Sequence, residues 1–432
     1  MKTKETYKGR AWRCCWLCCN FVAALLLLSA CQHDDTVGGD SQSPTSLVLE
    51  AQVEQTVTRA GQMGVMDNTT LATTGFGVFI YGKNGTSDLF ANQQHVTYIN
   101  GDTPNTGALD DLHQHPRKWN YGILHEWTEG ETYDFYAYAP YVASPSGSTG
   151  ITAVTGHPDG PVVSYTVATD PAQSVDLLWG VRGETGLPWL NQTQESNGGL
   201  VFFNFRHALA AVGLHVQAMI DKENDLIDFT DVSDPNDLLG NDALKVTLQG
   251  ITITPKTNSF YDGGTLDLNN TAANTPLWSN GSRSIPSLTL NSSQINSDLT
   301  DEGDMAPSAM THKGVQKEAD SQVVIRQSGG KDQFFMLLPD AAQDYEVSVD
   351  YYVTYKTGDA TYKRLDYTGS KATFSQLPLV AGIRYWLNLV IGLKTVSVSV
   401  TAEDWQGIPV NIEELTERGT SANSSLSRRA GR

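Results

Sequence analysis

Hydrophobic and polar residues alternate with a period of two along several stretches of the chain. The first such stretch is residues 46–57, SLVLEAQVEQTV. One face carries Leu47, Leu49, Ala51, Val53 and Val57, with Gln55 as the only break, and the other face is polar except for Val48. Successive side chains of a β-strand point to opposite faces, so this pattern predicts a strand with one buried face.

The same signal returns along the rest of the chain, in short apolar or alternating runs separated by turns rich in Gly, Asn and Asp. We predict further strands at Phe76–Tyr81, Thr132–Ala139, Val162–Val167, Asp176–Val181, Leu200–Val216 (with a bend), Leu244–Thr254, Tyr345–Tyr355, Ile383–Ile391 and Thr395–Thr401. No amphipathic helix of 15 residues is predicted. Short strands at this spacing favour an all-β fold of antiparallel sandwiches.

The length of 432 residues indicates more than one domain, because single cores seldom grow beyond about 250–300 residues. The pattern changes near the turn TQESNGG, residues 193–199: the chain before it is rich in aromatic residues and loops, and the alternating runs after it are longer. We therefore predict an N-terminal sandwich over 46–195 and a C-terminal sandwich over 198–412. Residues 31–45 are polar and predict a tether, and residues 413–432 predict a flexible tail.

The N-terminus has the pattern of a bacterial lipoprotein signal peptide. A basic segment precedes an apolar run, which ends in Leu28-Ser29-Ala30-Cys31. The run is shorter than the roughly 20 residues of a spanning helix. We predict that residues 1–30 are removed and that Cys31 carries the lipid, palmitate included, which would tether the protein to a membrane without spanning it. A signal anchor or an ordinary buried helix are the alternatives.

Composition narrows the class of protein. The formal net charge is −19, which excludes a general nucleic-acid binder, since such proteins need a basic face. The chain has 5 cysteines, none of them after Cys31. The mature protein is therefore expected to fold without a disulfide bond.

No catalytic or metal-binding motif emerges from the sequence. His113 and His115 lie two residues apart in a polar segment, but two histidines without a third ligand are more typical of an exposed loop. Acidic residues repeat every third position from Asp225 to Asp237, unlike the alternate acids and central Gly of an EF-hand. His207 is interpreted as a buried structural histidine. We expect no enzymatic activity, no cofactor and no metal.

An ordered series of motifs resembles one known family. The series comprises the lipoprotein box, the strand ending at Thr58-Arg59, Trp127, YDFYAYAPY (133–141), VDLLWG (175–180), Phe203, Phe205, HALA (207–210), ITITP (251–255), Trp278, FFMLLPD (334–340), Tyr385–Val390 and Trp405. Together these motifs are similar to those of the fimbrillin, or Mfa-like, proteins of Bacteroidales, which are subunits of type V pili.

The resemblance implies two tandem transthyretin-like β-sandwich domains and assembly by donor-strand exchange. It implies export as a lipoprotein to the cell outer membrane, where an arginine-specific protease removes the N-terminal strand. Arg59 sits where that cut would fall, so residues 46–59 would be the removable strand. Removing it would uncover an apolar groove and two unpaired sheet edges, which another strand could fill.

Two C-terminal segments alternate suitably for the donor strand. One is Val396-Val398-Val400. The other, which we prefer as a free end because it lies beyond Trp405, is Ile408-Val410-Ile412.

The sequence thus predicts a fimbrial structural subunit, surface-exposed and part of the fimbrium after processing. Its partners would be other fimbrial subunits, the outer membrane through the lipid before processing, and host or bacterial surface ligands. The alternative is a non-polymerising surface lipoprotein that binds glycans or host ligands. Exposed tryptophans in one cleft would favour that alternative.

Overall fold

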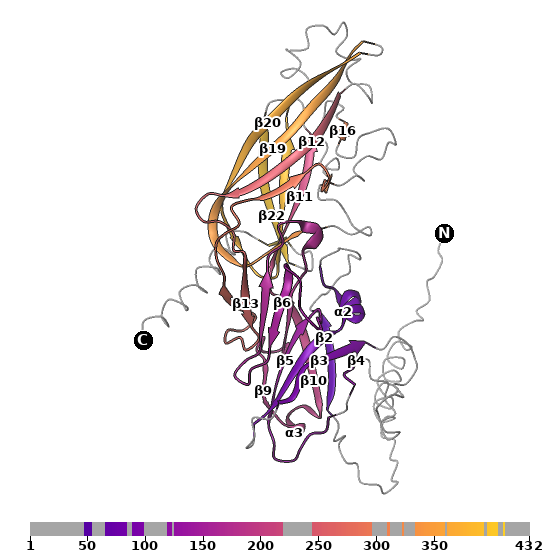
Figure 1. Cartoon of the computed structure of the whole chain (residues 1–432), viewed down its shortest axis with the longest axis vertical. Helices are drawn as coiled ribbons and strands as arrows, with labels where there is room; N and C mark the ends of the chain where they lie inside the picture. The colour runs from indigo at the N-terminus through magenta and orange to yellow at the C-terminus, as the bar shows by residue number, and fades with distance from the viewer. Residues whose placement is uncertain are drawn as a thin grey trace, which may run out of the picture. The chain divides into compact units, whose positions relative to one another are not determined.

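The computed structural model describes residues 47–53, 65–83, 89–98, 119–122, 125–218, 244–295, 309–311, 322–323, 333–358, 361–392, 395–404 and 409–410. Within these ranges the protein is nearly all β (Figure 1), which confirms the predicted fold class. The division into two transthyretin-like sandwiches remains a prediction. No helix among the described residues is long and apolar enough to cross a membrane.

The first sheet holds eight strands of the described chain, in the order β1-β10-β8-β5-β2-β3-β4, with β9 pairing with β5. Their bounds are β1 Val48–Val53, β2 Phe76–Gly82, β3 Leu89–Tyr98, β4 Trp119–Asn120, β5 Tyr133–Ala139, β8 Leu178–Val181, β9 Trp189–Gln192 and β10 Leu200–His207. The pairing of β1 with β10 is parallel, whereas the other pairings in this sheet are antiparallel. One inner face carries the first hydrophobic core, which includes Leu71, Phe76, Phe135, Phe203 and Phe205.

Three smaller sheets complete the described fold. The six-stranded sheet contains β11 Ala210–Ala218, β17 Gln322–Val323, β18 Phe335–Leu337, β21 Ile383–Ile391, β22 Val396–Asp404 and β23 Pro409–Val410. The five-stranded sheet contains β12 Leu244–Pro255, β15 Leu288–Asn291, β16 Ala309–Thr311, β19 Asp340–Gly358 and β20 Thr361–Leu379. The four-stranded sheet contains β6 Gly150–Thr155, β7 Val162–Thr166, β13 Gly263–Asp267 and β14 Leu277–Asn280.

The four-stranded sheet joins parts of the chain that the sequence analysis assigned to different sandwiches. β7 pairs antiparallel with β13, so Val163 lies opposite Leu266. Both side chains belong to the second hydrophobic core, which also collects residues of β11, β12, β19 and β21. The proposed boundary at 193–199 is therefore not a boundary between sheets, and the domain limits stay a prediction.

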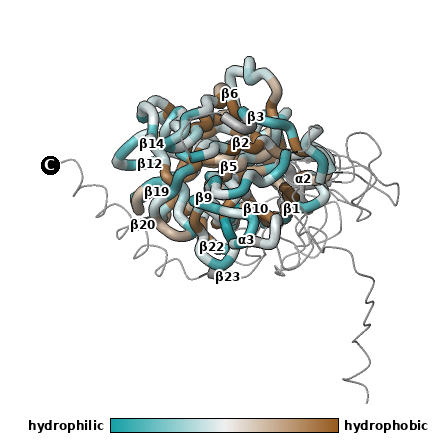
Figure 2. Tube along the Cα trace, turned by 90° about the horizontal axis from the view of Figure 1, so that it is seen from below, coloured by the Kyte–Doolittle hydropathy of each residue, from teal (hydrophilic) through white to brown (hydrophobic). Residues whose placement is uncertain are grey.

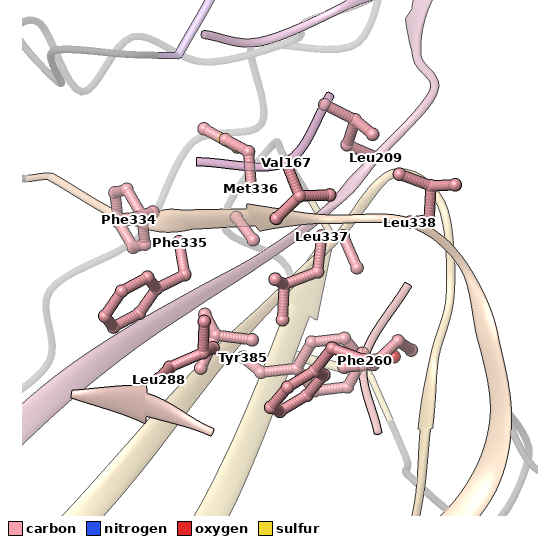
Figure 3. Close-up of a cluster of buried hydrophobic side chains, with 14 of the residues drawn as sticks. Val167, Leu209, Phe260, Leu288, Phe334, Phe335, Met336, Leu337, Leu338 and Tyr385 are labelled. Carbon is pink, nitrogen blue, oxygen red and sulfur yellow. The ribbon is translucent and has the colours of Figure 1, made fainter. Parts of the chain in front are cut away.

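The run FFMLL, residues 334–338, crosses the second core and is buried throughout. Met336 lies on one side of the strand with Val167 and Leu209, and Leu337 lies on the other with Phe260 (Figure 3). A strand that is apolar on both faces reads as a continuous hydrophobic run, which explains why this segment does not alternate. Hydrophobic residues gather along the inner strands, while the outer loops are hydrophilic (Figure 2).

Two local features differ from the sequence prediction. The stretch Leu200–Val216 forms two strands, β10 and β11, which belong to different sheets and meet at the buried Ala208 and Leu209. A seven-residue helix, α2 (Asn68–Thr74), precedes β2, and its N-cap Asp67 accepts a hydrogen bond from the Thr70 backbone N–H. The other helical segments of the described chain are the short α3 (Gln194–Asn197) and a 3₁₀ turn at Pro171–Gln173.

Candidate strand-binding groove

β1 lies at the end of the first sheet and pairs with one strand among the described residues, β10. The two run parallel, with Val48 opposite Leu200 and Val53 opposite Phe205. The Val48 N–H donates to the Gly199 carbonyl at 3.0 Å, so the even-numbered residues of β1 direct their backbone groups toward β10. The odd-numbered residues direct theirs to the opposite edge. Two hydrogen-bonded neighbours were expected for this strand, and within the described chain β1 has one, β10.

The odd-numbered side chains of β1 enter the first core. Leu47, Leu49 and Val53 are 2%, 1% and 1% exposed, and Ala51 is half-buried. Their neighbours in this core include the aromatic rings of Phe76, Phe203 and Phe205, whose centroids lie 5.2–6.2 Å apart. The predicted alternation is confirmed at these positions, and it places a row of apolar pockets beneath β1.

Among the described residues, side chains and one backbone carbonyl bind several backbone groups on the outer edge of β1. The Tyr121 hydroxyl donates to the Leu47 carbonyl at 2.7 Å, and the Trp119 Nε1–H donates to the Ala51 carbonyl at 3.2 Å. The Leu47 N–H donates to the His125 carbonyl at 2.8 Å. These contacts join β1 to β4 and to the segment that follows it, at the other end of the same sheet.

Asn68, at the start of α2, binds the last residue of β1. Its Oδ1 accepts from the Val53 N–H at 2.8 Å, and its Nδ2 donates to the Val53 carbonyl at 3.5 Å. The side-chain amide thus makes the two hydrogen bonds that a neighbouring strand would make. We call Asn68, Trp119 and Tyr121 the backbone clamp.

A buried carboxylate fixes the chain just before α2. The Met66 N–H donates to Asp176 Oδ2 at 2.9 Å, and His207 Nδ1 lies 2.7 Å from the same oxygen. The side chains of His207 and Asp176 are 3% and 0% exposed. His207 is therefore a buried structural histidine, as its sequence setting suggested.

His125 supports the clamp through its ring as well as its carbonyl. The imidazole stacks on the Tyr121 ring, with centroids 5.8 Å apart and planes at 3°. Burial lowers the pKa of His125 below its ordinary value, because desolvation disfavours the charged imidazolium.

Several predicted site residues lie outside the described residues: Cys31, Arg59, Val57, Ile408 and Ile412. Val410 is described, and its backbone pairs with Ala402 of β22 in the same chain. In the other candidate donor segment, Val396, Val398 and Val400 form part of β22 and are half-buried against the second core. The described part of the chain holds no group of three or more His, Cys, Asp or Glu residues arranged to bind a metal ion.

Sequence reasoning missed the backbone clamp. The sequence Asp67-Asn68-Thr69-Thr70 carries a helix N-cap signal. No local pattern indicates that the Asn68 side chain binds the backbone of Val53. Trp119 and Tyr121 follow a long polar stretch, and their role depends on the closure of the sheet, which has no local signature.

Comparison with known proteins shows which family and which solved structures this chain is similar to. The family model described as fimbrillin-like matches residues 58–405 of the chain. No curated protein matches. The crystal structure of a fimbrial protein from Bacteroides vulgatus is similar in fold, with a TM-score of 0.56 at 18% identity, covering 83% of this chain and 99% of the other.

A cell-adhesion candidate from Bacteroides uniformis matches with a TM-score of 0.37 at 16% identity, covering 84% of this chain and 99% of that one. The fimbrillin-like proteins are structural rather than catalytic, in agreement with the expectation that this chain is not an enzyme. The match over most of its length, together with the all-β fold, shows that the chain belongs to the fimbrillin-like family.

Proposed function

We propose that this protein is a fimbrial structural subunit that is exported as a lipoprotein and polymerises by donor-strand exchange. In this proposal Cys31 carries the lipid on the outer membrane, cleavage after Arg59 frees the first strand, and a strand of another subunit takes its place. The protein would then be exposed on the cell surface as part of the fimbrium, with other fimbrial subunits as its partners.

The observation that carries the proposal is the position of β1. It is a terminal strand of its sheet, it precedes Arg59, and it fills apolar pockets with Leu47, Leu49 and Val53. Burying three such side chains contributes roughly 5–9 kcal/mol before the cost of ordering the strand. Loss of β1 would therefore leave a groove that requires a new strand.

Arg59 is a suitable place for the cut, because it lies between two anchored points. Val53 is held by Asn68 on one side, and Met66 is held by Asp176 on the other. Cleavage between them would break the covalent link between β1 and the rest of the chain and leave both anchors in place.

N-terminal sequencing of protein sheared from cells tests the proposal. A mature N-terminus at Ala60 is expected for assembled subunits. The Arg59→Ala variant should fold, remain attached to the membrane and be absent from filaments. Filaments whose subunits are uncut after Arg59, or a lipidated Cys31 on every assembled copy, would contradict the proposed route.

No observation favours the alternative of a non-polymerising glycan-binding lipoprotein. Trp119, Trp127, Trp179, Trp189 and Trp386 are buried, and Trp278 is half-buried. The tryptophans of the described residues therefore provide no exposed stacking platform for a sugar.

A further inference from the structure

A lysine, a side-chain amide and a buried carboxylate meet in the first sheet. Lys83 directly follows β2, and its Nζ lies 2.8 Å from Asp134 Oδ2 and 2.8 Å from Asn191 Oδ1. Asp134 belongs to β5 and Asn191 to β9. Three separate parts of the chain thus bring an amine within hydrogen-bonding distance of both an amide and a carboxyl group.

The strands that carry the lysine and the carboxylate explain why these groups meet. Lys83 extends β2 alongside β5, because its backbone N–H donates to the Thr132 carbonyl at 2.9 Å. Alternate residues of the two strands, Tyr81 and Tyr136 among them, pack in the second core. Lys83 and Asp134 continue the same two rows, since side chains two residues apart share a face of the sheet.

An irregularity in the pairing of β9 with β5 brings the amide to the same place. The register shifts between Tyr133 and Phe135 of β5, on either side of Asp134. Asn191 takes a φ of 56°, a left-handed conformation that Asn tolerates better than most residues. Its backbone N–H donates to Asp134 Oδ1 at 2.7 Å. Bulges of this kind redirect side chains, and here both the backbone and the side chain of Asn191 are held beside the carboxylate.

The burial of the carboxylate favours a reaction between the other two groups. Asp134 is 3% exposed, and buried charges are costly. Transfer of one proton along the hydrogen bond from Lys83 to Asp134 neutralises both and leaves a nucleophilic amine. Because the Cγ–Oδ1 bond of Asn191 is about 1.2 Å long, this amine lies within about 4 Å of the amide carbon.

We propose that Lys83 and Asn191 become joined by an isopeptide bond, an amide between two side chains, and that Asp134 moves the protons. Lys83 Nζ attacks Asn191 Cγ and forms the new C–N bond. Asp134, as a neutral acid, donates a proton to Nδ2 and takes one from Nζ, so it ends in the form in which it began the attack. The Cγ–Nδ2 bond breaks and ammonia leaves. The Lys83 side chain is 40% exposed, which gives the ammonia a route into solvent. The reaction needs no oxidant, reductant or further reactant.

The bond would fasten the first sheet covalently. Among the described strands β9 pairs with β5 alone, and that pairing is irregular. A link between residues 83 and 191 closes a long loop, which reduces the entropy of the unfolded chain. It also resists a pulling force that would separate hydrogen-bonded strands. Its formation requires neither cleavage after Arg59 nor a donor strand, so an uncut chain is suitable for testing it.

Tryptic peptide mapping of the purified full chain tests for the bond. Trypsin does not cleave after an acylated lysine, so residues 60–117 should form one peptide. This peptide should be joined to residues 183–206, and the mass of the pair should be their sum less one ammonia molecule. Separate peptides 60–83 and 183–206 with unmodified masses would overturn the proposal.

Lys83→Arg is the variant that distinguishes the bond from an ion pair. Arginine keeps a positive charge beside Asp134 but has no amine to form this amide, so the link should disappear. Lys371→Arg is the matched control, because Lys371 also pairs with a carboxylate, that of Glu346, and the link should persist. If the loss of ammonia persists in Lys83→Arg, Asn191 has cyclised on its own backbone, and the proposal is wrong.

Asp134→Asn tests the assigned proton transfer. The substitution keeps the size of the side chain and an oxygen for the Asn191 N–H, but the amide cannot exchange protons with the amine. The variant should fold, as circular dichroism would report. It should form the link at least about a hundredfold more slowly after synthesis than wild type does. Linkage at the wild-type rate would overturn the role assigned to Asp134.

Discussion

The side-chain amide of Asn68 binds both backbone groups of Val53, accepting from its N–H at 2.8 Å and donating to its carbonyl at 3.5 Å. A single side chain thus holds the last residue of β1, the strand that precedes the proposed cleavage site. Asn68 belongs to α2, which stays with the subunit after cleavage, whereas Val53 belongs to the part that would leave. This contact is therefore expected to hold β1 in place until a competing strand arrives.

Replacing Asn68 by alanine should loosen β1. Two hydrogen bonds are lost at the end of the strand, so we expect the free energy of unfolding to fall by about 1–2 kcal/mol. Once the chain has been cut, the 46–59 peptide should dissociate faster. Urea denaturation and the rate of peptide release measure the two effects. Thr69→Ala, exposed on the same helix, is the control and should change neither.

The Tyr121→Phe variant tests the other end of the clamp. It removes the hydroxyl that donates to the Leu47 carbonyl and keeps the ring that stacks on His125. We expect a loss of about 0.5–1.5 kcal/mol in the free energy of unfolding. Tyr98→Phe is a matched control, because the Tyr98 ring packs in the same core. An equal effect of both substitutions would show that the Tyr121 hydroxyl contributes nothing specific.

Removing the Asp176 carboxylate is expected to lower the free energy of unfolding more than the substitutions of Asn68 and Tyr121 do. Asp176→Ala leaves the Met66 N–H and His207 Nδ1 without their shared acceptor in a buried site, which should cost about 2–4 kcal/mol. Asp176→Asn keeps an acceptor oxygen and should cost less. Denaturant unfolding of both variants measures the difference. An alanine variant as stable as wild type would show that the carboxylate does not anchor this segment.

The strands could be predicted from the sequence because alternation is local. The prediction was right for β1, where Leu47, Leu49 and Val53 are all buried, and for β21 and β22. The pairing of Val163 with Leu266 could not be predicted, because it joins residues far apart in the chain that carry no complementary local signal. The backbone groups of β1 that face β10 could not be predicted either, because only the Val48–Gly199 hydrogen bond shows which of them do.

Lowering the pH should lower the free energy of unfolding, and His125 should be one source of this effect. Burial lowers the pKa of His125 in the folded protein, so the unfolded chain binds a proton more readily than the folded one. The stability contributed by the neutral imidazole is therefore complete above the unfolded pKa of about 6.5 and falls as pH drops below it. Urea unfolding measured between pH 7.5 and pH 5 should show this decline. The His125→Gln variant should show a shallower decline, and an unchanged slope would exclude His125 as its source.

Glu403 fastens the end of β22 in its own subunit, and its removal should affect stability and assembly in opposite directions. Its Oε1 accepts from Arg384 Nε and Nη2, both at 2.6 Å, and from Trp386 Nε1 at 2.8 Å. The Arg384 side chain is only 7% exposed. Glu403→Ala leaves this guanidinium buried without its carboxylate and should lower the free energy of unfolding by about 2–4 kcal/mol.

If β22 is the donor strand, the same variant should release it more readily, and processed subunits should polymerise faster than wild type in a light-scattering assay. Glu346→Ala is the control, because Glu346 pairs with the exposed Lys371 side chain, where water screens the attraction between the two charges. A Glu403→Ala protein that is destabilised yet assembles at the wild-type rate would argue that β22 stays in its own sheet. The donor would then have to come from elsewhere in the chain.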